Sequence, residues 1–253
     1  VFMNETICTI MKRGSLRRYK EENISDEHLD IILNAAMRAP TAGNMMTYSI
    51  ITVRKEETKK KLAISCDNQP FIAKAPLILI FLADYSKWYK YYEVNGVREF
   101  QKDRGETFAG PSAGSFVLAV QDAVIAAESL GIGSCYIGDI MEQKEYHKTL
   151  FNLPEYVFPV AMLTLGYYPE DYMVPLKERF AEKYVVFEER YNELSKEDID
   201  DMFRKREQLF TAKNKYNAKN YAQMHYNFKV KAPFSKEMQR SVEEALKEWD
   251  KKE

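Results

Sequence analysis

The stretch GPSAGSFVLAVQDAVIAAESLGIGSCYIGDI, residues 110–140, predicts a helix, a glycine turn and a short strand in direct succession. Pro111 suits the first turn of a helix, and Gly131 stands where a C′ glycine would close it. Between them apolar side chains occur on every side of the helix axis, which is typical of a buried helix. Gln121, Asp122 and Glu128 interrupt the apolar run and argue against a membrane span. We therefore expect this stretch to form the middle of the core.

Composition restricts the classes of protein to which the chain can belong. A chain of 253 residues can bury a large core, as one domain or as one domain with an extension. Its 37 basic and 38 acidic residues give no overall charge that would favour nucleic acid. Cys8, Cys66 and Cys135 form no C-x-x-C pair, so neither a disulfide framework nor a zinc site follows. With no signal peptide visible at the start, we expect a cytoplasmic protein with reduced thiols.

The flanking sequence predicts an α+β fold with helices around a central sheet. Asn4 and Ser25 can each cap a helix, and the second of these helices extends to Met37. Residues 49–53, 76–83 and 157–167 are predicted strands. The run 76–83, PLILIFLA, is apolar throughout, which indicates a central strand covered on both faces.

Two segments differ in character from this core. Residues 84–110 mix aromatic and charged side chains between a strand and the central helix, a position where a lid over a pocket could lie. Permanent packing of this insertion on the surface is the alternative. Residues 188–253 are polar and helical without an apolar core of their own. We therefore predict a core over residues 1–187 and a C-terminal extension over 188–253 that wraps around something else.

Basic side chains occur in two short clusters that suit a phosphate group. Arg13, Ser15 and Arg17 form the first cluster, and Lys177 and Arg179 form the second. Guanidinium groups and a hydroxyl bind phosphate well, but composition alone favours a solvated basic face. The glycines at 131 and 133 lack the third glycine of a dinucleotide fingerprint and follow a helix instead of opening one.

The residues themselves show no catalytic machinery. The three histidines are scattered without metal-ligand spacing, and no nucleophile elbow is present. An enzyme built on this chain would therefore need an organic cofactor, and we expect no bound metal.

Five motifs in matching order make the chain resemble the FMN-dependent nitroreductase family. They are RGSLRRY at 13–19, APTAGNMMTY at 39–48, AAESLGIGSCYIGDI at 126–140, LGYYP at 165–169 and LKER at 176–179. The likeness is greatest to the flavin-reductase-like NAD(P)H nitroreductase branch and covers about residues 4–190. It implies a central mixed β-sheet flanked by helices, in an intertwined homodimer whose C-terminal extension wraps the dimer.

The resemblance also implies a set of FMN-binding positions. The first and last motifs would hold the FMN phosphate, and residues 40–44 would approach the flavin from the partner subunit. Gln69 would bind the pyrimidine edge, and the backbone of residues 136–139 would face the ring, with an N–H near flavin N5. The full set is Arg13, Gly14, Ser15, Arg17, Pro40, Thr41, Ala42, Asn44, Gln69, Tyr136, Ile137, Gly138, Asp139, Lys177 and Arg179.

Two positions depart from the family pattern. Met46 stands where the family has a glutamine, which removes a polar side chain near the flavin. Asp139 replaces the second glycine after Y-I-G. Its charge beside the ring would disfavour the anionic reduced flavin and lower its reduction potential, unless the side chain points away.

By this resemblance the protein is an oxidoreductase that passes hydride from NADPH or NADH to flavin N5 in ping-pong fashion. Nitroaromatics, quinones or free flavin would be the acceptors, and no side chain is an obligatory acid or base. Another flavin chemistry on the same scaffold and a non-catalytic flavin-storage protein are the alternatives. Five lysines between 213 and 231 would favour the 2′-phosphate of NADPH or would only keep the segment soluble.

Overall fold

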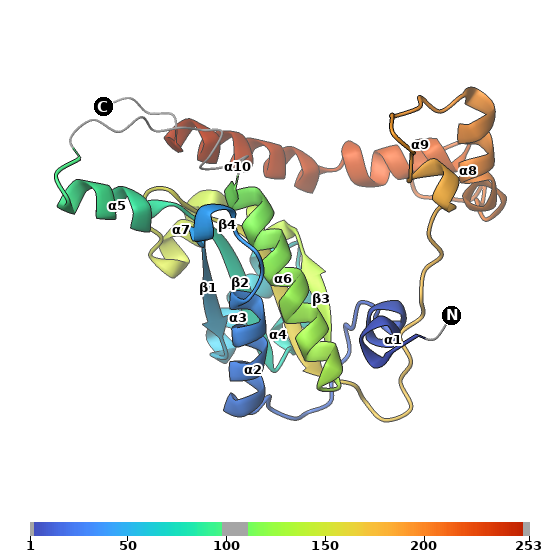
Figure 1. The fold of residues 1–253 in the computed structure, drawn as a ribbon. Helices are drawn as coiled ribbons and strands as arrows, with labels where there is room; N and C mark the ends of the chain where they lie inside the picture. The colour runs from blue at the N-terminus through green and yellow to red at the C-terminus, as the bar shows by residue number, and fades with distance from the viewer. Residues whose placement is uncertain (1–2, 98–110, 250–253) are drawn as a thin grey trace. The chain divides into compact units, whose positions relative to one another are not determined.

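The computed structural model describes residues 3–97 and 111–249, and the side chains of residues 111–116 are not described. The chain divides into two compact units, which are described separately below. The first unit contains residues 1–175 and 237–253, and the second contains residues 176–236. Figure 1 shows the elements in chain order by colour. The expected boundary at 187/188 and the wrapping of a dimer by residues 188–253 stay predictions.

A four-stranded sheet forms the centre of the first unit. Its strands are β1 (Tyr48–Val53), β2 (Leu77–Asp84), β3 (Ile132–Ile137) and β4 (Val157–Tyr167), in the order β1-β2-β4-β3. The strand pairs are antiparallel, whereas the resemblance implied a mixed sheet. Ser15 and Ser134 form an isolated bridge that is parallel. Every residue of β2 is buried, as its apolar run predicted.

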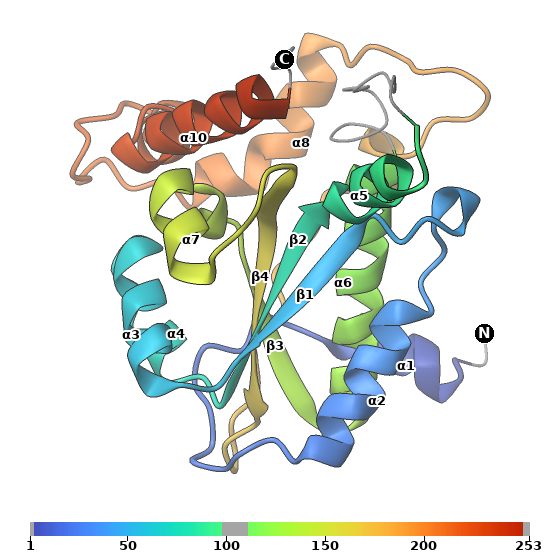
Figure 2. The same ribbon diagram turned by 90° about the vertical axis from the view of Figure 1, so that its left-hand side faces the viewer.

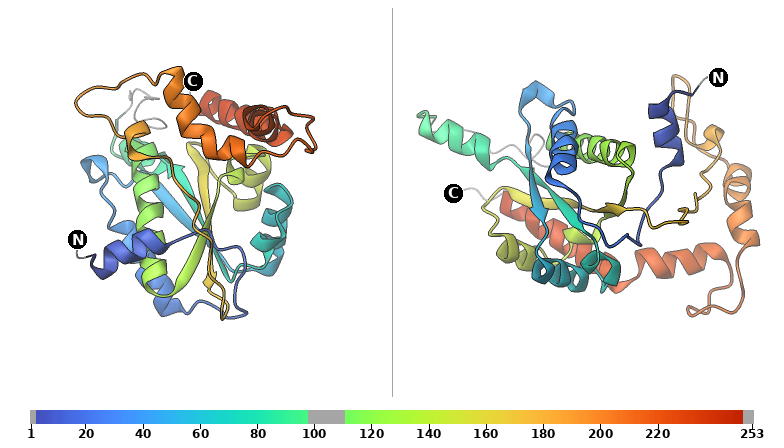
Figure 3. Two further views of the ribbon diagram at one scale, coloured as in Figure 1. Left: turned by 90° about the vertical axis from the view of Figure 1, so that its right-hand side faces the viewer. Right: turned by 90° about the horizontal axis from the view of Figure 1, so that it is seen from below.

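Helices cover both faces of this sheet (Figures 2 and 3). On one face α2 (Asp26–Met37) and α6 (Pro111–Ser129) pack against alternate residues of β2, among them Leu79 and Phe81. On the other face α3 (Glu56–Ser65), α4 (Pro70–Ala73) and α7 (Lys144–Phe151) pack against the intervening residues, among them Ile78 and Ile80. The predicted α+β class is confirmed.

The predicted helix signals are found where the sequence placed them. Asn4 accepts a hydrogen bond from the Ile7 N–H at 3.0 Å at the start of α1 (Glu5–Lys12). Ser25 accepts one from the His28 N–H at 3.1 Å at the start of α2. Gly131 has a φ of +73° directly after α6, the left-handed conformation expected of a C′ glycine.

The prediction that α6 is buried on all sides is wrong for the single chain. Ala119, Ala123 and Ala127 are fully buried against the sheet, but Val117 is 53% exposed and Leu118 is 43% exposed. The apolar residues of α1 are exposed as well, with Met11 at 62%. Side chains on this face of the unit therefore keep apolar surface in water, which is typical of a surface that another chain covers.

Only part of the aromatic insertion lies among the described residues. Helix α5 (Ser86–Val94) follows β2, and residues 98–110 lie outside the described part of the chain. The Trp88 indole N–H donates to the Met45 carbonyl at 2.8 Å, and Lys87 Nζ donates to the Tyr48 carbonyl at 2.8 Å. These bonds attach α5 to the segment before β1 and to the first residue of β1. A lid function of residues 84–110 stays a prediction.

The last helix, α10 (Pro233–Trp249), returns the chain to the first unit. Val242, Ala245 and Trp249 pack against Ala83, Phe158 and Val160 of β2 and β4 in a third apolar cluster.

The second unit contains the 3-10 turn η4 (Glu182–Tyr184) and the helices α8 (Lys196–Gln208) and α9 (Tyr221–His225), followed by the π-turn η5 (Tyr226–Val230). Ser195 and Asp198 form a capping box at the start of α8. The lysine-rich segment 213–231 lies in this unit. Within the described ranges, no helix has the length and apolar character needed to cross a membrane.

Candidate functional site

The arginine motif at 13–17 lies along strand β3. The Leu16 N–H donates to the Ser134 carbonyl at 2.8 Å, and Ser15 forms the parallel bridge with Ser134. Leu16 is fully buried between the two arginines of the motif. The Tyr19 hydroxyl also binds the Leu16 carbonyl at 3.2 Å and the Thr164 hydroxyl at 2.8 Å. Residues 13–19 are therefore fixed to the sheet, while Arg13 and Arg17 keep part of their surface in solvent.

Arg13 and Arg17 border one surface, each beside an aromatic ring. The Arg13 guanidinium lies 6.0 Å from the ring centre of Tyr136, and the Arg17 guanidinium lies 5.8 Å from that of Phe71. Burial raises the pKa of the Cys135 thiol, and the charges of Arg17 and Arg13 offset part of this effect. Cys135, in the middle of β3, therefore lies within the field of both guanidinium groups.

Arg13 carries an unsatisfied donor. Its Nε is buried and has no hydrogen-bond partner among the described residues, and the buried Ser134 hydroxyl has none there either. A buried donor of a charged group without a partner is costly, so this geometry suits an anion that accepts from Arg13. Glu128 offers negative charge nearby but binds the Tyr168 hydroxyl with both carboxylate oxygens, at 3.1 and 2.9 Å.

Gln69 and Asp139 meet at the far end of β3. Gln69 Nε2 donates to Asp139 Oδ2 at 2.7 Å and to the Cys66 carbonyl at 2.9 Å. Both amide protons are then in use, so Oε1 is the part of the Gln69 amide left to bind a ligand. The Asp139 side chain thus points at Gln69, and its position relative to the flavin ring stays a prediction.

The described residues therefore bring together three predicted segments. Arg13 to Arg17 contact β3, Gln69 contacts Asp139, and Phe71 of α4 links the Gln69 segment to Arg17. Tyr136 binds the Gln121 amide oxygen of α6 through its hydroxyl at 3.0 Å. Burial raises the Tyr136 pKa to about 12, so this hydroxyl is neutral at pH 7.

Other predicted positions are not joined to this surface. Pro40, Thr41, Ala42 and Asn44 form a turn around the 3-10 helix η1 (Ala42–Asn44), in which the Thr41 hydroxyl accepts from the Met46 N–H at 3.0 Å. The Met46 side chain packs in part against the apolar cluster of α2 and α6. Lys177 and Arg179 are exposed and belong to the second unit, so their approach to the phosphate stays a prediction.

Sequence reasoning missed Phe71 and Ser134, which now belong to the candidate site. Phe71 follows Gln69 by two residues, so its short distance in the sequence from a predicted site residue could have indicated that it belongs to the site. Ser134 precedes the recognised Y-I-G motif, but its partner Ser15 lies far away in the sequence, so the pairing left no local sequence pattern.

Comparison with known proteins shows the family to which the chain is related. The family model described as the nitroreductase family matches residues 10–167. The chain belongs to the nitroreductase family. It is 32% identical over 191 residues to "FMN reductase [NAD(P)H]" of Bacillus subtilis, covering 75% of both chains. It is 30% identical over 197 residues to "NADPH-flavin oxidoreductase" of Vibrio harveyi, covering 78% of this chain and 79% of that one.

A solved structure gives the same result at the level of the fold. The structure of NfrA2 from B. megaterium matches 96% of this chain and 98% of its own, with a TM-score of 0.83 and 34% identity. The resemblance to the nitroreductase family and the predicted oxidoreductase class are thus confirmed. The names of the two curated relatives also contain the cofactor groups that the resemblance implied.

Gly133 provides a test of the packing that fixes the arginine motif. A Cβ at this position would lie 2.6 Å from Leu16 Cδ2 and 2.7 Å from Tyr168 Cζ, so Gly133→Ala must displace one of them. We expect a loss of about 1–3 kcal/mol in the free energy of unfolding, as for other overpacked sites. Because Leu16 lies between Arg13 and Arg17, affinity for the anionic ligand should fall with it.

The matched control for this variant is Gly131→Ala at the start of the same strand. Nothing lies within 4 Å of a Cβ there, although its φ of +73° strains any side chain. It should lose stability without losing ligand affinity. Thermal melts and FMN titrations of both variants make the comparison. Equal FMN affinities in the two variants would mean that Leu16 does not position the arginines.

Proposed function

We propose that the protein is an FMN-dependent oxidoreductase that uses NADPH or NADH to reduce small electron-poor acceptors such as nitroaromatics, quinones or free flavin. The observation that carries this proposal is the buried, unpartnered Nε of Arg13 in a motif fixed to β3. It supports a phosphate subsite at one end of the strand, while Gln69 and Asp139 offer a polar edge at the other end.

The residues present fit the phosphate of FMN. Arg13 and Arg17 offer charged donors, and the Ser15 hydroxyl lies between them in the sequence. Lys177 and Arg179 are proposed to complete this subsite from the second unit. When bound, FMN would supply the hydride transfer through its N5 atom, and reductant and acceptor would use the same face in turn.

The chain's own residues would bind and orient the ring. The Oε1 atom of Gln69 can accept a hydrogen bond from the pyrimidine edge, because its amide protons are already given to Asp139 and Cys66. The backbone of residues 136–139 is proposed to face the ring. Asp139 keeps a carboxylate beside Gln69, and its negative charge would disfavour an anionic reduced flavin.

No side-chain nucleophile is assigned in this proposal. Burial raises the pKa of Cys135, so the residue remains a neutral thiol near pH 7. The arginines beside it act on a bound phosphate by charge and hydrogen bonding. Specificity for the acceptor would then depend on the shape of the cavity above the ring.

A homodimer is part of the proposal. Val117 and Leu118 of α6 and Ile7, Ile10 and Met11 of α1 are all at least 40% exposed in the single chain. Contact with a second copy would remove this apolar surface from water. Thr41 and Asn44 are proposed to reach the flavin of the partner subunit. A cytoplasmic location stays a prediction.

An anaerobic visible spectrum of the purified protein tests this function. We expect a yellow protein with bound FMN whose absorbance near 450 nm, the usual flavin band, is lost on adding NADPH or NADH. The colour should return on adding a quinone or a nitroaromatic. A flavin-storage protein would stay yellow with either nucleotide, and a colourless protein with no affinity for FMN would refute the cofactor assignment.

A further inference from the structure

Three carboxylates meet next to Gln69, outside the proposed phosphate subsite. Oxygen atoms of Asp67, Asp139 and Glu142 all lie within 4.8 Å of one another. Asp67 lies just after α3 with a φ of +59°, and Asp139 opens the 3-10 turn η3 (Asp139–Met141). Asp67 is exposed, Asp139 is half-buried and Glu142 is 3% exposed. The cluster therefore has an open side at Asp67 and a closed end at Glu142.

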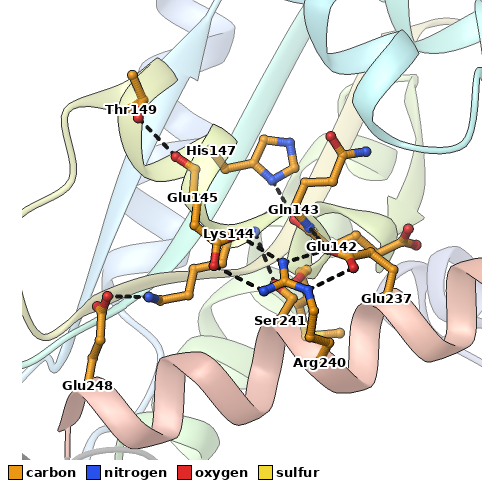
Figure 4. Close-up of polar contacts among 11 residues, drawn as sticks. Glu142, Gln143, Lys144, Glu145, His147, Thr149, Glu237, Arg240, Ser241 and Glu248 are labelled. Carbon is orange, nitrogen blue, oxygen red and sulfur yellow. Dashed lines mark hydrogen bonds and ion pairs between the residues drawn. The ribbon is translucent and has the colours of Figure 1, made fainter.

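Glu142 is the unusual member of this cluster. Its side chain is buried, and within the described part of the chain its Oε1 has no hydrogen-bond partner. An acid on a mobile loop could turn toward water, but the backbone here is fixed. The His147 ring donates from Nδ1 to the Glu142 carbonyl at 2.8 Å (Figure 4), and its Nε2 lies 2.8 Å from the Ser65 hydroxyl. A buried carboxylate oxygen without a partner is costly, so another group must offset it.

The surroundings of Glu142 add negative charge. Burial and the charges of Asp67, Asp139 and Glu237 raise the pKa of Glu142 to about 8. Two basic residues of the adjoining segments pair with other acids. Arg240 pairs with Glu237 at 2.7 Å and with Glu145 at 2.9 Å, and Lys144 pairs with Glu248 (Figure 4).

We propose that Asp67, Asp139 and Glu142 bind a divalent cation of the size of Ca²⁺ or Mn²⁺. Carboxylate oxygens without nitrogen or sulfur ligands are the set that such hard cations prefer. Two oxygens on opposite sides of Ca²⁺ lie up to about 5 Å apart, because each ligand distance is roughly 2.3–2.6 Å. Separations within 4.8 Å therefore hold such an ion with little movement of the chain.

The place of this site gives it a consequence for the flavin, which rests on the proposed function. Asp139 Oδ2 already accepts from Gln69 Nε2, and Gln69 is proposed to bind the pyrimidine edge. A cation on Asp139 would offset negative charge there and make the reduced flavin easier to form. No local sequence pattern indicates this site, because its three acids come from two separate segments of the chain.

Binding of Mn²⁺ to the full-length protein tests the proposal. Protein stripped of metal by a chelator is titrated with Mn²⁺, and the free ion is followed by its electron paramagnetic resonance signal. We expect one Mn²⁺ per chain, with a Kd on the order of 10⁻⁵–10⁻³ M, and displacement by Ca²⁺. Absence of a stoichiometric site would overturn the proposal and would leave a proton on Glu142 as the group that relieves the cluster.

Three variants make the result specific. Glu142→Gln keeps the volume of the side chain and removes its charge, and we expect it to weaken Mn²⁺ binding at least tenfold. Asp67→Asn also removes a charge at constant volume, at an exposed position where folding is not at risk, and we expect the same weakening of Mn²⁺ binding. Glu155→Gln removes an exposed carboxylate outside the cluster and should bind like the wild type. Wild-type affinity in both cluster variants, with circular dichroism showing that they fold, would overturn the assignment.

The titration also separates this inference from the proposed function, because none of the three acids is assigned to the phosphate. It is run on protein with and without added FMN. Stoichiometric Mn²⁺ binding by a protein that never binds FMN would support the cation site and refute the cofactor. FMN binding by a protein without a stoichiometric Mn²⁺ site would support the cofactor assignment and refute the cation site.

Discussion

Replacing Arg13 by alanine is expected to weaken FMN binding by about 1.5–3 kcal/mol, or roughly 10- to 150-fold, the range for hydrogen bonds to charged groups. Its Nε is the buried donor without a partner, so the variant loses a bond that the structure leaves available to a ligand. The FMN affinity of Arg13→Lys should lie between those of the wild type and Arg13→Ala, since lysine keeps the charge and loses the planar fork. Fluorescence titration of FMN into cofactor-free protein measures the three affinities.

Arg18→Ala is the matched control. It removes the same charge from the same segment, but the Arg18 guanidinium lies 5.9 Å from the Tyr172 ring centre, away from the Tyr136 contact of Arg13. A loss of less than about 0.5 kcal/mol is expected, as for most surface substitutions. If Arg13→Ala and Arg18→Ala bind FMN equally well, the phosphate subsite does not lie at Arg13.

Much of the core could be predicted because its signals are local. The run before Asp84 is apolar at every position, and a strand covered on both faces needs this pattern. Asn4, Ser25 and Gly131 end or begin helices through bonds and backbone angles that involve only neighbouring residues. Such features depend little on the rest of the fold, and their positions agree with the prediction.

The residues of the candidate site were predicted from the resemblance to the family, whereas the contacts between them became visible only in the structure. Nothing in the sequence pairs Gln69 with Asp139, because the two belong to different elements that tertiary folding brings together. Asp139 was noticed as a departure from the family pattern, but its direction could not be known. Glu142 gave no signal at all, since an acid in a polar segment is usually exposed.

The difference between the expected and the observed burial of α6 has another cause. Its apolar residues occur all around the axis, and the rule that such helices are buried concerns the assembled protein. In one chain the sheet covers Ala119, Ala123 and Ala127 but leaves Val117 and Leu118 in water. The pattern therefore records a surface beyond the single chain, and the proposed homodimer would account for it.

The second large effect is expected at the end of α10. Trp249 is 3% exposed and packs with Ala245 and Val242 against Phe158 and its neighbours in the sheet. Trp249→Ala should lower the free energy of unfolding by about 3–5 kcal/mol, because it removes a large buried ring and leaves a cavity. That is a large share of the 5–15 kcal/mol typical of a domain, so a marked fall in Tm is expected. Thermal melts and urea titrations measure it.

The polar contacts of α10 give this variant a second readout. Ser241 Oγ donates to the Met141 carbonyl at 2.5 Å, and the Gln143 N–H donates to Glu237 at 3.2 Å, which holds the segment after Asp139 against the helix (Figure 4). The exposed ion pairs of Arg240 contribute little, so we expect the apolar contact of Trp249 to supply much of the docking energy. Losing it should also loosen residues 141–143 and speed their amide hydrogen exchange. Lys247→Ala is the control, because Lys247 lies on the exposed side of the same turn. It should leave both the stability and the amide exchange nearly unchanged. If Trp249→Ala changed stability and exchange no more than Lys247→Ala, this end of α10 would not stabilise the first unit.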